Sequence, residues 1–234
     1  MGYYKMQLPN GEVSDGHTDP AWQWDNYRLP KRVDGLKVYD YGTWDGGIAI
    51  EAAKRGAREV WGLDSFVWEM WPETKRAFDK HVAALAPSVQ HAYVETEPVP
   101  RRRFNAQTAI NTSTKMNIEA FGNKHGTADI VVAAGVFYHL MNPLKFIEDL
   151  TCLMGPVSRL YMTTFCLKDI RHPDPIMRFA YGWNGDNTNY WLASVSCVMQ
   201  MLQYAGLNLI ERYQVLPGTD QHPEPLIMFH ARKA

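Results

Sequence analysis

Two aspartates, Asp40 and Asp64, each follow a short apolar stretch and stand 24 positions apart (64 − 40). A carboxylate at the position of Asp64 can accept hydrogen bonds from both hydroxyls of a ribose. The carboxylate of Asp40 can lie near a cationic amine, directly or through water. Together they predict a ligand with an amino-acid head group and a ribose. Taken alone, Asp40 also fits a turn residue and Asp64 a helix cap.

A glycine-rich segment, residues 42–47 (Gly-Thr-Trp-Asp-Gly-Gly), begins two residues after Asp40. Glycines let the backbone approach a ligand closely, and the helix expected next offers free N–H groups to a carboxylate or a phosphate. The segment lacks the GxGxxG spacing of a dinucleotide site, and no Lys-Ser or Lys-Thr follows it as in a P-loop. It therefore favours S-adenosylmethionine as the cofactor over a dinucleotide.

A second pair of residues with reactive side chains, Tyr138 and His139, comes shortly after the apolar run 129–134. A histidine has an ordinary pKa of about 6.5 and can act as a general base when an acceptor must lose a proton. The alternative for His139 is a structural role, in which it braces the helix that follows. The sequence has no HxxxH motif or carboxylate cluster, so we expect no catalytic metal.

Strands and helices must position these residues, and their patterns alternate from Lys37 onward. Strands are predicted at 37–41, 59–64, near 108–111, 129–134 and 159–165, and helices at 48–55, 73–86, 143–154 and 194–204. Two further strands, 207–215 and 225–231, follow without a helix between them. This order predicts an α/β fold, a doubly wound Rossmann-like seven-stranded sheet with a C-terminal antiparallel hairpin. Its ligand site should lie at the carboxyl ends of the strands.

Three segments stand outside this alternation. Residues 1–35 are polar, aromatic and rich in turn formers, and we expect them to form an N-terminal lid on a domain spanning residues 36–234. The loop 166–190 is long enough to predict a lid or a binding loop. A basic triplet, residues 101–103, fits a solvated loop or a contact with an acidic substrate.

Composition limits the class of protein. A chain of 234 residues with 46% hydrophobic residues suits one domain, and a net charge of −1 gives no global field that would attract a polyanion. No apolar run approaches the roughly 18 residues that span a bilayer, and no signal peptide is evident at the N-terminus. The three cysteines form no CxxC pair, as in a reducing compartment. We expect a soluble, cytoplasmic protein without a membrane partner.

Several of these segments resemble a known family. Residues 38–46, 51–57 and 60–65 resemble the opening of class I S-adenosylmethionine-dependent methyltransferases. Residues 135–144 (Gly-Val-Phe-Tyr-His-Leu-Met-Asn-Pro-Leu) are similar to the branch that includes the tRNA wobble-uridine (5-oxyacetic acid pathway) methyltransferases. Some relatives in that branch use carboxy-S-adenosylmethionine as the donor.

The resemblance implies a cofactor site with four parts. The methionine portion lies among Asp40, Gly42 and Thr43, the ribose at Asp64 and Ser65, the adenine at Asn117 and Ile118, and the sulfonium beside Ala134 and Gly135. Tyr138 and His139 then lie where the acceptor arrives. The resemblance also implies that the N-terminal segment covers the cofactor, with a role for Trp22 and Trp24.

The acceptor is the least determined part of the prediction. The net charge and the length favour a small molecule, whereas the branch resemblance favours a tRNA uridine. Two other classes remain as alternatives: a cofactor-binding protein without turnover, and a nucleotide-dependent oxidoreductase, which the glycine spacing disfavours. The sequence does not define an oligomeric state.

Overall fold

The structure is a computed structural model that describes residues 2–96, 115–219 and 223–234. The chain divides into two compact units, Met1–Ala128 and Asp129–Ala234, named here the N-terminal and C-terminal units. In the described part of the chain, no helix has both the length and the apolar character needed to cross a membrane.

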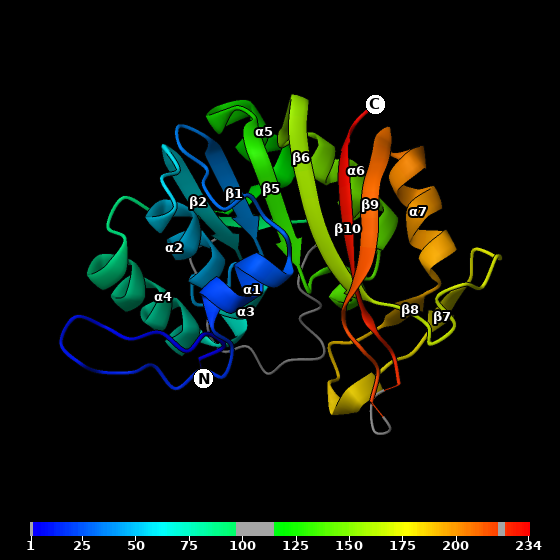
Figure 1. Ribbon diagram of the computed structural model, residues 1–234, viewed down its shortest axis with the longest axis horizontal. Coiled ribbons are helices and arrows are strands. Elements are labelled where there is room, and N and C mark those ends of the chain that lie inside the picture. The colour runs from blue at the N-terminus through cyan, green and yellow to red at the C-terminus, as the bar shows by residue number, and fades with distance from the viewer. Residues whose placement is uncertain (1, 97–114, 220–222) are drawn as a thin grey trace. The chain divides into compact units, whose positions relative to one another are not determined.

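Parallel strands form the centre of the N-terminal unit, in the spatial order β4-β3-β2-β1. Figure 1 labels β1 and β2 of this set. They are β1 (Lys37–Tyr41), β2 (Glu59–Asp64), β3 (Gln90–Glu95) and β4 (Met116–Asn117). In their register Asp40 lies beside Gly62, and Asp64 lies beside Tyr93. Every residue of β1 is buried, as expected of an inner parallel strand.

The described residues of the same unit form five helices. They are α1 (Pro20–Asn26), α2 (Gly47–Lys54), α3 (Phe66–Met70), α4 (Pro72–Leu85) and α5 (Ile118–His125). Local chemistry fixes two of their starts. Asp19 caps α1 by accepting the N–H groups of Ala21 and Trp22, and Asn117 caps α5 by accepting that of Ala120.

The C-terminal unit has strands in the order β5-β6-β10-β9, and its last strand in sequence lies between two others (Figure 1). The strands are β5 (Ala128–Ala134), β6 (Met154–Phe165), β9 (Leu207–Leu216) and β10 (Leu226–Lys233). β10 runs antiparallel to both β6 and β9. This arrangement buries every residue of β10 from Leu226 to Ala231.

Helices and a small sheet complete this unit. The helices are η2 (Phe137–His139), α6 (Pro143–Thr151), η3 (Trp183–Gly185) and α7 (Val195–Tyr204). β7 (Met177–Phe179) and β8 (Trp191–Ala193) pair as a separate antiparallel sheet. The buried face of α6 is Phe146, Ile147 and Leu150, at the spacing of one helix face.

Three predicted elements need correction. The strand that pairs with β2 on its outer side is β3, at residues 90–95, and not the strand predicted near 108–111. Residues 108–111 and the basic triplet 101–103 lie outside the described residues. Only Ala92 and Val94 of β3 are buried, so its apolar signal is short. The segment 166–190, predicted as a loop, contains β7 and η3. The helix predicted to reach residue 154 ends at Thr151, because Met154 already belongs to β6.

Candidate functional site

The predicted site residues fall into two groups, one in each unit. In the N-terminal unit the loop between β1 and α2 is fixed to β2, because the N–H groups of Gly42 and Thr43 donate to the carbonyl of Leu63 at 2.8 and 3.2 Å. Gly42 has φ 76°, a left-handed conformation that glycine adopts without a steric cost. The loop therefore holds Asp40, Gly42 and Thr43 beside the end of the strand that carries Asp64.

Asp40, near the end of β1, and Thr43 in the loop form a buried hydrogen-bonded pair. The Thr43 hydroxyl donates to Oδ2 of Asp40 at 2.7 Å, and both residues are almost without solvent exposure. Burial raises the pKa of Asp40 to about 7, against the hydrogen bonds from Thr43 and from the Ala49 backbone, and the nearby Asp64 raises it further. At neutral pH this carboxyl group is thus poised between its two protonation states.

Asp64 closes β2 and faces the same loop. Its Oδ2 accepts the N–H of Trp44 at 3.2 Å and its Oδ1 accepts that of Val67 at 3.1 Å, so the side chain does cap α3. Burial raises the pKa of Asp64 to about 6, with the backbone hydrogen bonds acting in the opposite direction. A carboxylate has about four acceptor positions, so the backbone hydrogen bonds leave acceptor capacity for a ligand hydroxyl. Ser65 follows it, buried, at the start of α3.

Neither acid has a cationic partner, since no lysine or arginine in the described residues pairs with Asp40 or Asp64. Two buried carboxyl groups without a counter-charge are unfavourable in a protein that binds nothing there. Beside them the buried indole Nε1 of Trp44 has no hydrogen-bond partner among the described residues. Unpaired acids and an orphaned donor fit a ligand that supplies a cation, hydroxyl groups and an acceptor.

The N-terminal segment is attached to this loop by contacts that sequence analysis missed. The buried carboxylate of Asp45 accepts the backbone N–H groups of Tyr3 and Tyr4 at 3.0 and 3.2 Å. The ring of Tyr4 lies against Gly47, where an added Cβ would come within 2.3 Å of it. The ring centroids of Tyr3 and Trp44 are 5.9 Å apart. The N-terminal segment therefore contacts the loop between β1 and α2 through Tyr3 and Tyr4.

Trp22 and Trp24, which the resemblance places over the cofactor, differ in their surroundings. Trp24 is fully buried, donates from Nε1 to the carbonyl of Pro30, and packs under the guanidinium of Arg55 at 5.3 Å. Trp22 is about half exposed on α1. The two residues are two positions apart in α1, so their side chains point to different sides of the helix, that of Trp24 toward the core and that of Trp22 toward solvent.

The residues predicted at the adenine, Asn117 and Ile118, lie where β4 meets α5. Asn117 caps this helix, with its Oδ1 accepting the N–H of Ala120 at 2.7 Å, and the side chain of Ile118 is fully buried. Nearby, Lys115 forms ion pairs with Glu95 and Glu69. The side chains of Asn117 and Ile118 are therefore used by the fold, which leaves their backbone groups for a ligand.

In the C-terminal unit, Ala134 and Gly135 end β5. Gly135 has φ 70° and its N–H donates to both the hydroxyl and the carbonyl of Thr163, at 3.0 and 3.2 Å. An added Cβ at Gly135 would lie 3.3 Å from the hydroxyl oxygen of Tyr138. Glycine at this position thus lets the Tyr138 side chain lie over the end of the strand.

Tyr138 and His139 follow on η2, their rings 4.3 Å apart. Nδ1 of His139 lies 2.9 Å from Oγ1 of Thr188 and 3.2 Å from its carbonyl oxygen. Burial lowers the pKa of His139, against the charge of Asp186 and the backbone hydrogen bond at Thr188. The unit therefore brings Gly135, Tyr138 and His139 together and adds two residues that sequence analysis missed, Thr188 and Asp186.

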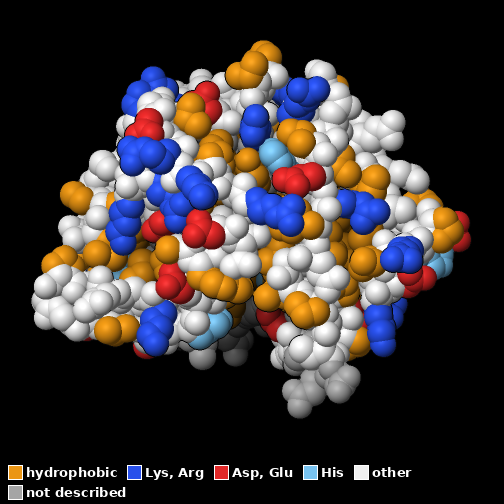
Figure 2. All heavy atoms as spheres, viewed as in Figure 1, with side chains coloured by type: hydrophobic (Ala, Val, Ile, Leu, Met, Phe, Trp, Pro, Cys, Tyr) orange, Lys and Arg blue, Asp and Glu red, His pale blue; other side chains and the backbone are white. Residues whose placement is uncertain are grey.

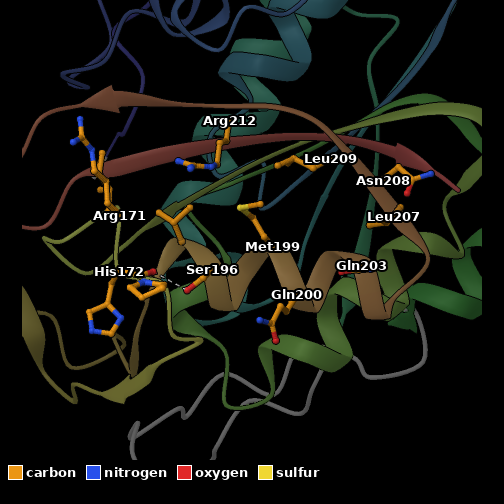
Figure 3. Close-up of a pocket in the computed structure, with 13 residues that line it drawn as sticks. Arg171, His172, Ser196, Met199, Gln200, Gln203, Leu207, Asn208, Leu209 and Arg212 are labelled. Carbon is orange, nitrogen blue, oxygen red and sulfur yellow. Dashed lines mark hydrogen bonds between the residues drawn. The ribbon is translucent and has the colours of Figure 1, made fainter.

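A separate groove of about 450 Å³ lies between α7, β9 and residues 170–173 (Figure 3). Met199 of α7 points toward β9 in this view, and Arg171 and Arg212 lie at the same end of the groove. None of its lining residues is acidic, and none belongs to the predicted site. The groove is therefore distinct from the residues predicted to bind the cofactor.

Comparison with known proteins identifies the family. Residues 23–212 match the family described as the methyltransferase domain. This match covers most of the chain, which therefore belongs to the methyltransferase domain family. The predictions of a methyltransferase and of an enzyme are confirmed at this level, whereas the tRNA branch is not identified by it. No curated protein matches the chain.

Solved structures share the fold at low sequence identity. The N-terminal domain of EvdMO1 with SAH bound is 13% identical, with a TM-score of 0.63 over 98% of this chain and 90% of that chain. An S-adenosylmethionine-dependent methyltransferase from Mesorhizobium loti is 13% identical, with a TM-score of 0.61 over 90% and 97%. A third is 1,6-didemethyltoxoflavin-N1-methyltransferase from Burkholderia thailandensis, which is 12% identical, with a TM-score of 0.56 over 92% of this chain and 76% of that chain. The predicted α/β Rossmann-like methyltransferase fold is confirmed.

Proposed function

We propose that this protein transfers the methyl group of S-adenosylmethionine to a small-molecule acceptor. One observation carries the proposal: Asp40 and Asp64 are buried and have no cationic partner in the described residues. Both accept hydrogen bonds from the same loop, Asp40 from Thr43 and Asp64 from Trp44. S-adenosylmethionine supplies an ammonium group for the first acid and ribose hydroxyls for the second. Membership in the methyltransferase domain family agrees with this assignment.

Each part of the cofactor has a proposed set of residues. The methionine portion is held by Asp40, Gly42 and Thr43, and the ribose by Asp64 and Ser65. The adenine lies against Asn117 and Ile118, and the sulfonium is flanked by the backbone of Ala134 and Gly135. Trp44 joins this set, because its buried Nε1 is a donor without a partner in the described residues.

When bound, the cofactor supplies a methyl group that is already activated by the sulfonium charge. The chain then has to align the acceptor for in-line displacement, which contributes up to roughly 7–11 kcal/mol, and to exclude water. We assign acceptor contact to Tyr138 and His139, which lie together on η2. His139 is the group that can take a proton from an acceptor.

The N-terminal segment, residues 1–35, is proposed as the cover of the cofactor site in a domain that otherwise spans residues 36–234. Asp45 supports this, because it holds the backbone of Tyr3 and Tyr4 against the loop that carries Thr43 and Trp44. The cover is thus anchored at the site itself.

A cytoplasmic location is part of the same proposal. None of the three cysteines, all of which lie in the described residues, forms a disulfide. Burial raises the pKa of Cys166 to about 12 and also raises that of Cys197, so these thiols are unreactive near neutral pH. Cysteines that form no disulfide agree with a reducing compartment.

Methylation of a tRNA wobble uridine is the second candidate, and the resemblance of residues 135–144 supports it. The charge distribution favours the small molecule, since the net charge is −1 and Figure 2 shows basic side chains interspersed with acidic ones over the face viewed. A tRNA site requires contacts with phosphates, and its affinity falls steeply with salt. Tight, salt-dependent binding of tRNA, with methyl transfer to it, would reverse this preference.

Calorimetric titration with S-adenosylmethionine and S-adenosylhomocysteine tests the cofactor, with NADH as the control ligand. We expect micromolar binding of both sulfur compounds, and none of NADH. Asp64→Ala should abolish that binding while leaving the chain folded by circular dichroism. Binding of NADH alone would overturn the proposal. Acceptors are then screened by S-adenosylhomocysteine release, with small molecules and total tRNA compared side by side.

A further inference from the structure

His139, Thr188 and Asp186 form a continuous hydrogen-bonded chain within the C-terminal unit. The Thr188 hydroxyl lies 2.9 Å from Nδ1 of His139 and donates to Oδ1 of Asp186 at 2.6 Å. The same carboxylate oxygen accepts the backbone N–H of Thr188 at 2.8 Å, and the carbonyl of Thr188 lies 3.2 Å from Nδ1. The backbone and the side chain of Thr188 thus both connect the imidazole to the carboxylate.

The direction of these hydrogen bonds fixes the tautomer of His139. An ionised carboxylate can only accept, so the single hydroxyl proton of Thr188 is directed to Asp186. Both oxygens of Thr188 that face Nδ1 are then acceptors, and Nδ1 must carry the ring proton. The described residues offer no hydrogen-bond partner to Nε2. The neutral imidazole therefore presents a lone pair on Nε2.

The surroundings keep this imidazole neutral and also prepare it to receive a proton. Burial lowers the pKa of His139, and Asp186 is the charged group in the described residues that raises it. The other titratable group beside it is Tyr138, with its ring 4.3 Å away. Beyond Tyr138, Trp183 donates to Glu224, which is paired with Arg178 at 3.4 Å. Among the described residues, Asp186 is thus the group whose negative charge favours a protonated His139 ring.

The segment that carries the chain is attached to η2 by its backbone. The N–H of Tyr190 donates to the carbonyl of Tyr138 at 2.9 Å, and the Thr188 side chain is buried. Asn189 fixes the same turn, donating from Nδ2 to the carbonyl of Trp183 at 2.8 Å. Because these contacts order the segment around Thr188, its hydroxyl is held in position for His139.

We propose that Thr188 and Asp186 are positioning residues that present Nε2 of His139 as a general base, and that the acceptor is therefore a hydroxyl or N–H group of a small molecule. The inference rests on the proposed function. The acceptor oxygen or nitrogen forms a bond to the methyl carbon, and the carbon–sulfur bond breaks with its electron pair remaining on sulfur. The acceptor proton passes to Nε2, and Asp186 balances the imidazolium charge until solvent removes the proton.

Nitrogen NMR of protein labelled with ¹⁵N-histidine tests the tautomer without any acceptor. We expect the His139 signals, assigned by their loss in His139→Gln, to show protonated Nδ1 and unprotonated Nε2. Thr188→Val keeps the side-chain shape but removes the hydroxyl, and it should shift the signals toward the Nε2–H tautomer. Thr188→Ser should restore the wild-type pattern. An Nε2–H tautomer in the wild type, or no change in Thr188→Val, would overturn the proposal.

Kinetics test the catalytic consequence with a panel of phenols, aliphatic alcohols and amines. Thr188→Val and Asp186→Asn should each lower kcat about 10-fold or more, with little change in KM, since a general base contributes about 10²–10⁴-fold. Asp186→Asn should also move the acidic limb of the kcat/KM profile to lower pH, because it removes the charge that favours the imidazolium. Asp169→Asn, an exposed acid in the same segment, is the matched control.

The outcomes separate this inference from the proposed function. If S-adenosylmethionine binds and is turned over but Thr188→Val has wild-type kcat, the positioning role is wrong while the proposed function stands. Transfer only to acceptors that have no proton to lose would likewise overturn it. If no S-adenosylmethionine binds to the wild type, the proposed function fails, and the catalytic role of the chain fails with it.

Discussion

The hydroxyl of Thr43 donates a 2.7 Å hydrogen bond to the carboxylate of Asp40, and both side chains are buried. This bond favours the ionised carboxylate, whereas burial favours the protonated form and prevails, so the pKa of Asp40 rises to about 7. A cation bound beside the carboxylate would reverse that balance. In the proposed site, the protonation of Asp40 would therefore be coupled to the binding of a positively charged ligand.

The affinity for S-adenosylmethionine should increase with pH between about 6 and 8. A cationic ligand binds the ionised form of Asp40, and that form becomes dominant as the pH rises through its pKa of about 7. Calorimetry in matched buffers measures the effect, which should approach 10-fold per pH unit below the pKa. Asp40→Asn should bind weakly at every pH, and an equally steep pH dependence in that variant would contradict the assignment.

The same carboxyl group should destabilise the ligand-free protein above neutral pH. With a pKa of about 7 when folded and an ordinary value near 3.8 when unfolded, Asp40 binds its proton more tightly in the folded state. The free energy of unfolding therefore falls as the pH rises from about 4 to 7, and then levels off. Asp40→Asn removes this loss, so the variant should be more stable at pH 8 by about 1–4 kcal/mol.

Urea denaturation of both proteins at pH 5 and pH 8 checks that expectation. The gain in stability from Asp40→Asn should be larger at pH 8 than at pH 5. Asp34→Asn is the control, because Asp34 is exposed and its pKa is lowered by Arg32 instead of raised. A smaller gain at pH 8 than at pH 5 would show that the pKa of Asp40 is not raised in the folded protein.

Asp64→Asn should weaken cofactor binding about 10- to 100-fold, because hydrogen bonds to a charged group contribute roughly 1.5–3 kcal/mol. The variant should also lose stability, since one of the N–H groups of Trp44 and Val67 then faces an amide NH₂. Calorimetry and thermal unfolding separate the two effects. Asp79→Asn, an exposed acid on α4, should change neither by more than the small amount expected of a surface ion pair.

Asp45→Ala should release the N-terminal segment. It leaves the buried N–H groups of Tyr3 and Tyr4 without their acceptor, at a cost of about 1–3 kcal/mol. We expect faster limited proteolysis within residues 5–18 and weaker binding of S-adenosylmethionine. Asp15→Ala removes an exposed carboxylate that accepts the N–H of Gly2 in the same segment. Equal proteolysis rates for the two variants would remove Asp45 from this role.

The loop between β1 and α2 was predictable because its signals are local. Asp40, Gly42 and Thr43 lie within four positions, at or just after the end of β1. The capping role of Asp64 was equally local, since its Val67 partner is three residues away. Where the signal was short, as in β3 with Ala92 and Val94 alone buried, prediction placed the strand elsewhere.

By itself the sequence determined most of the order of strands and helices, the glycine-rich loop after Asp40 and the position of Asp64, because periodicity and glycine spacing act over a few residues. Only the tertiary structure brought Asp45 to Tyr4, 41 residues away, and His139 to Thr188, 49 residues away. It also decided that Trp24 belongs to the core. Such contacts depend on how packed elements bring distant segments together, and no local pattern of residue types encodes that.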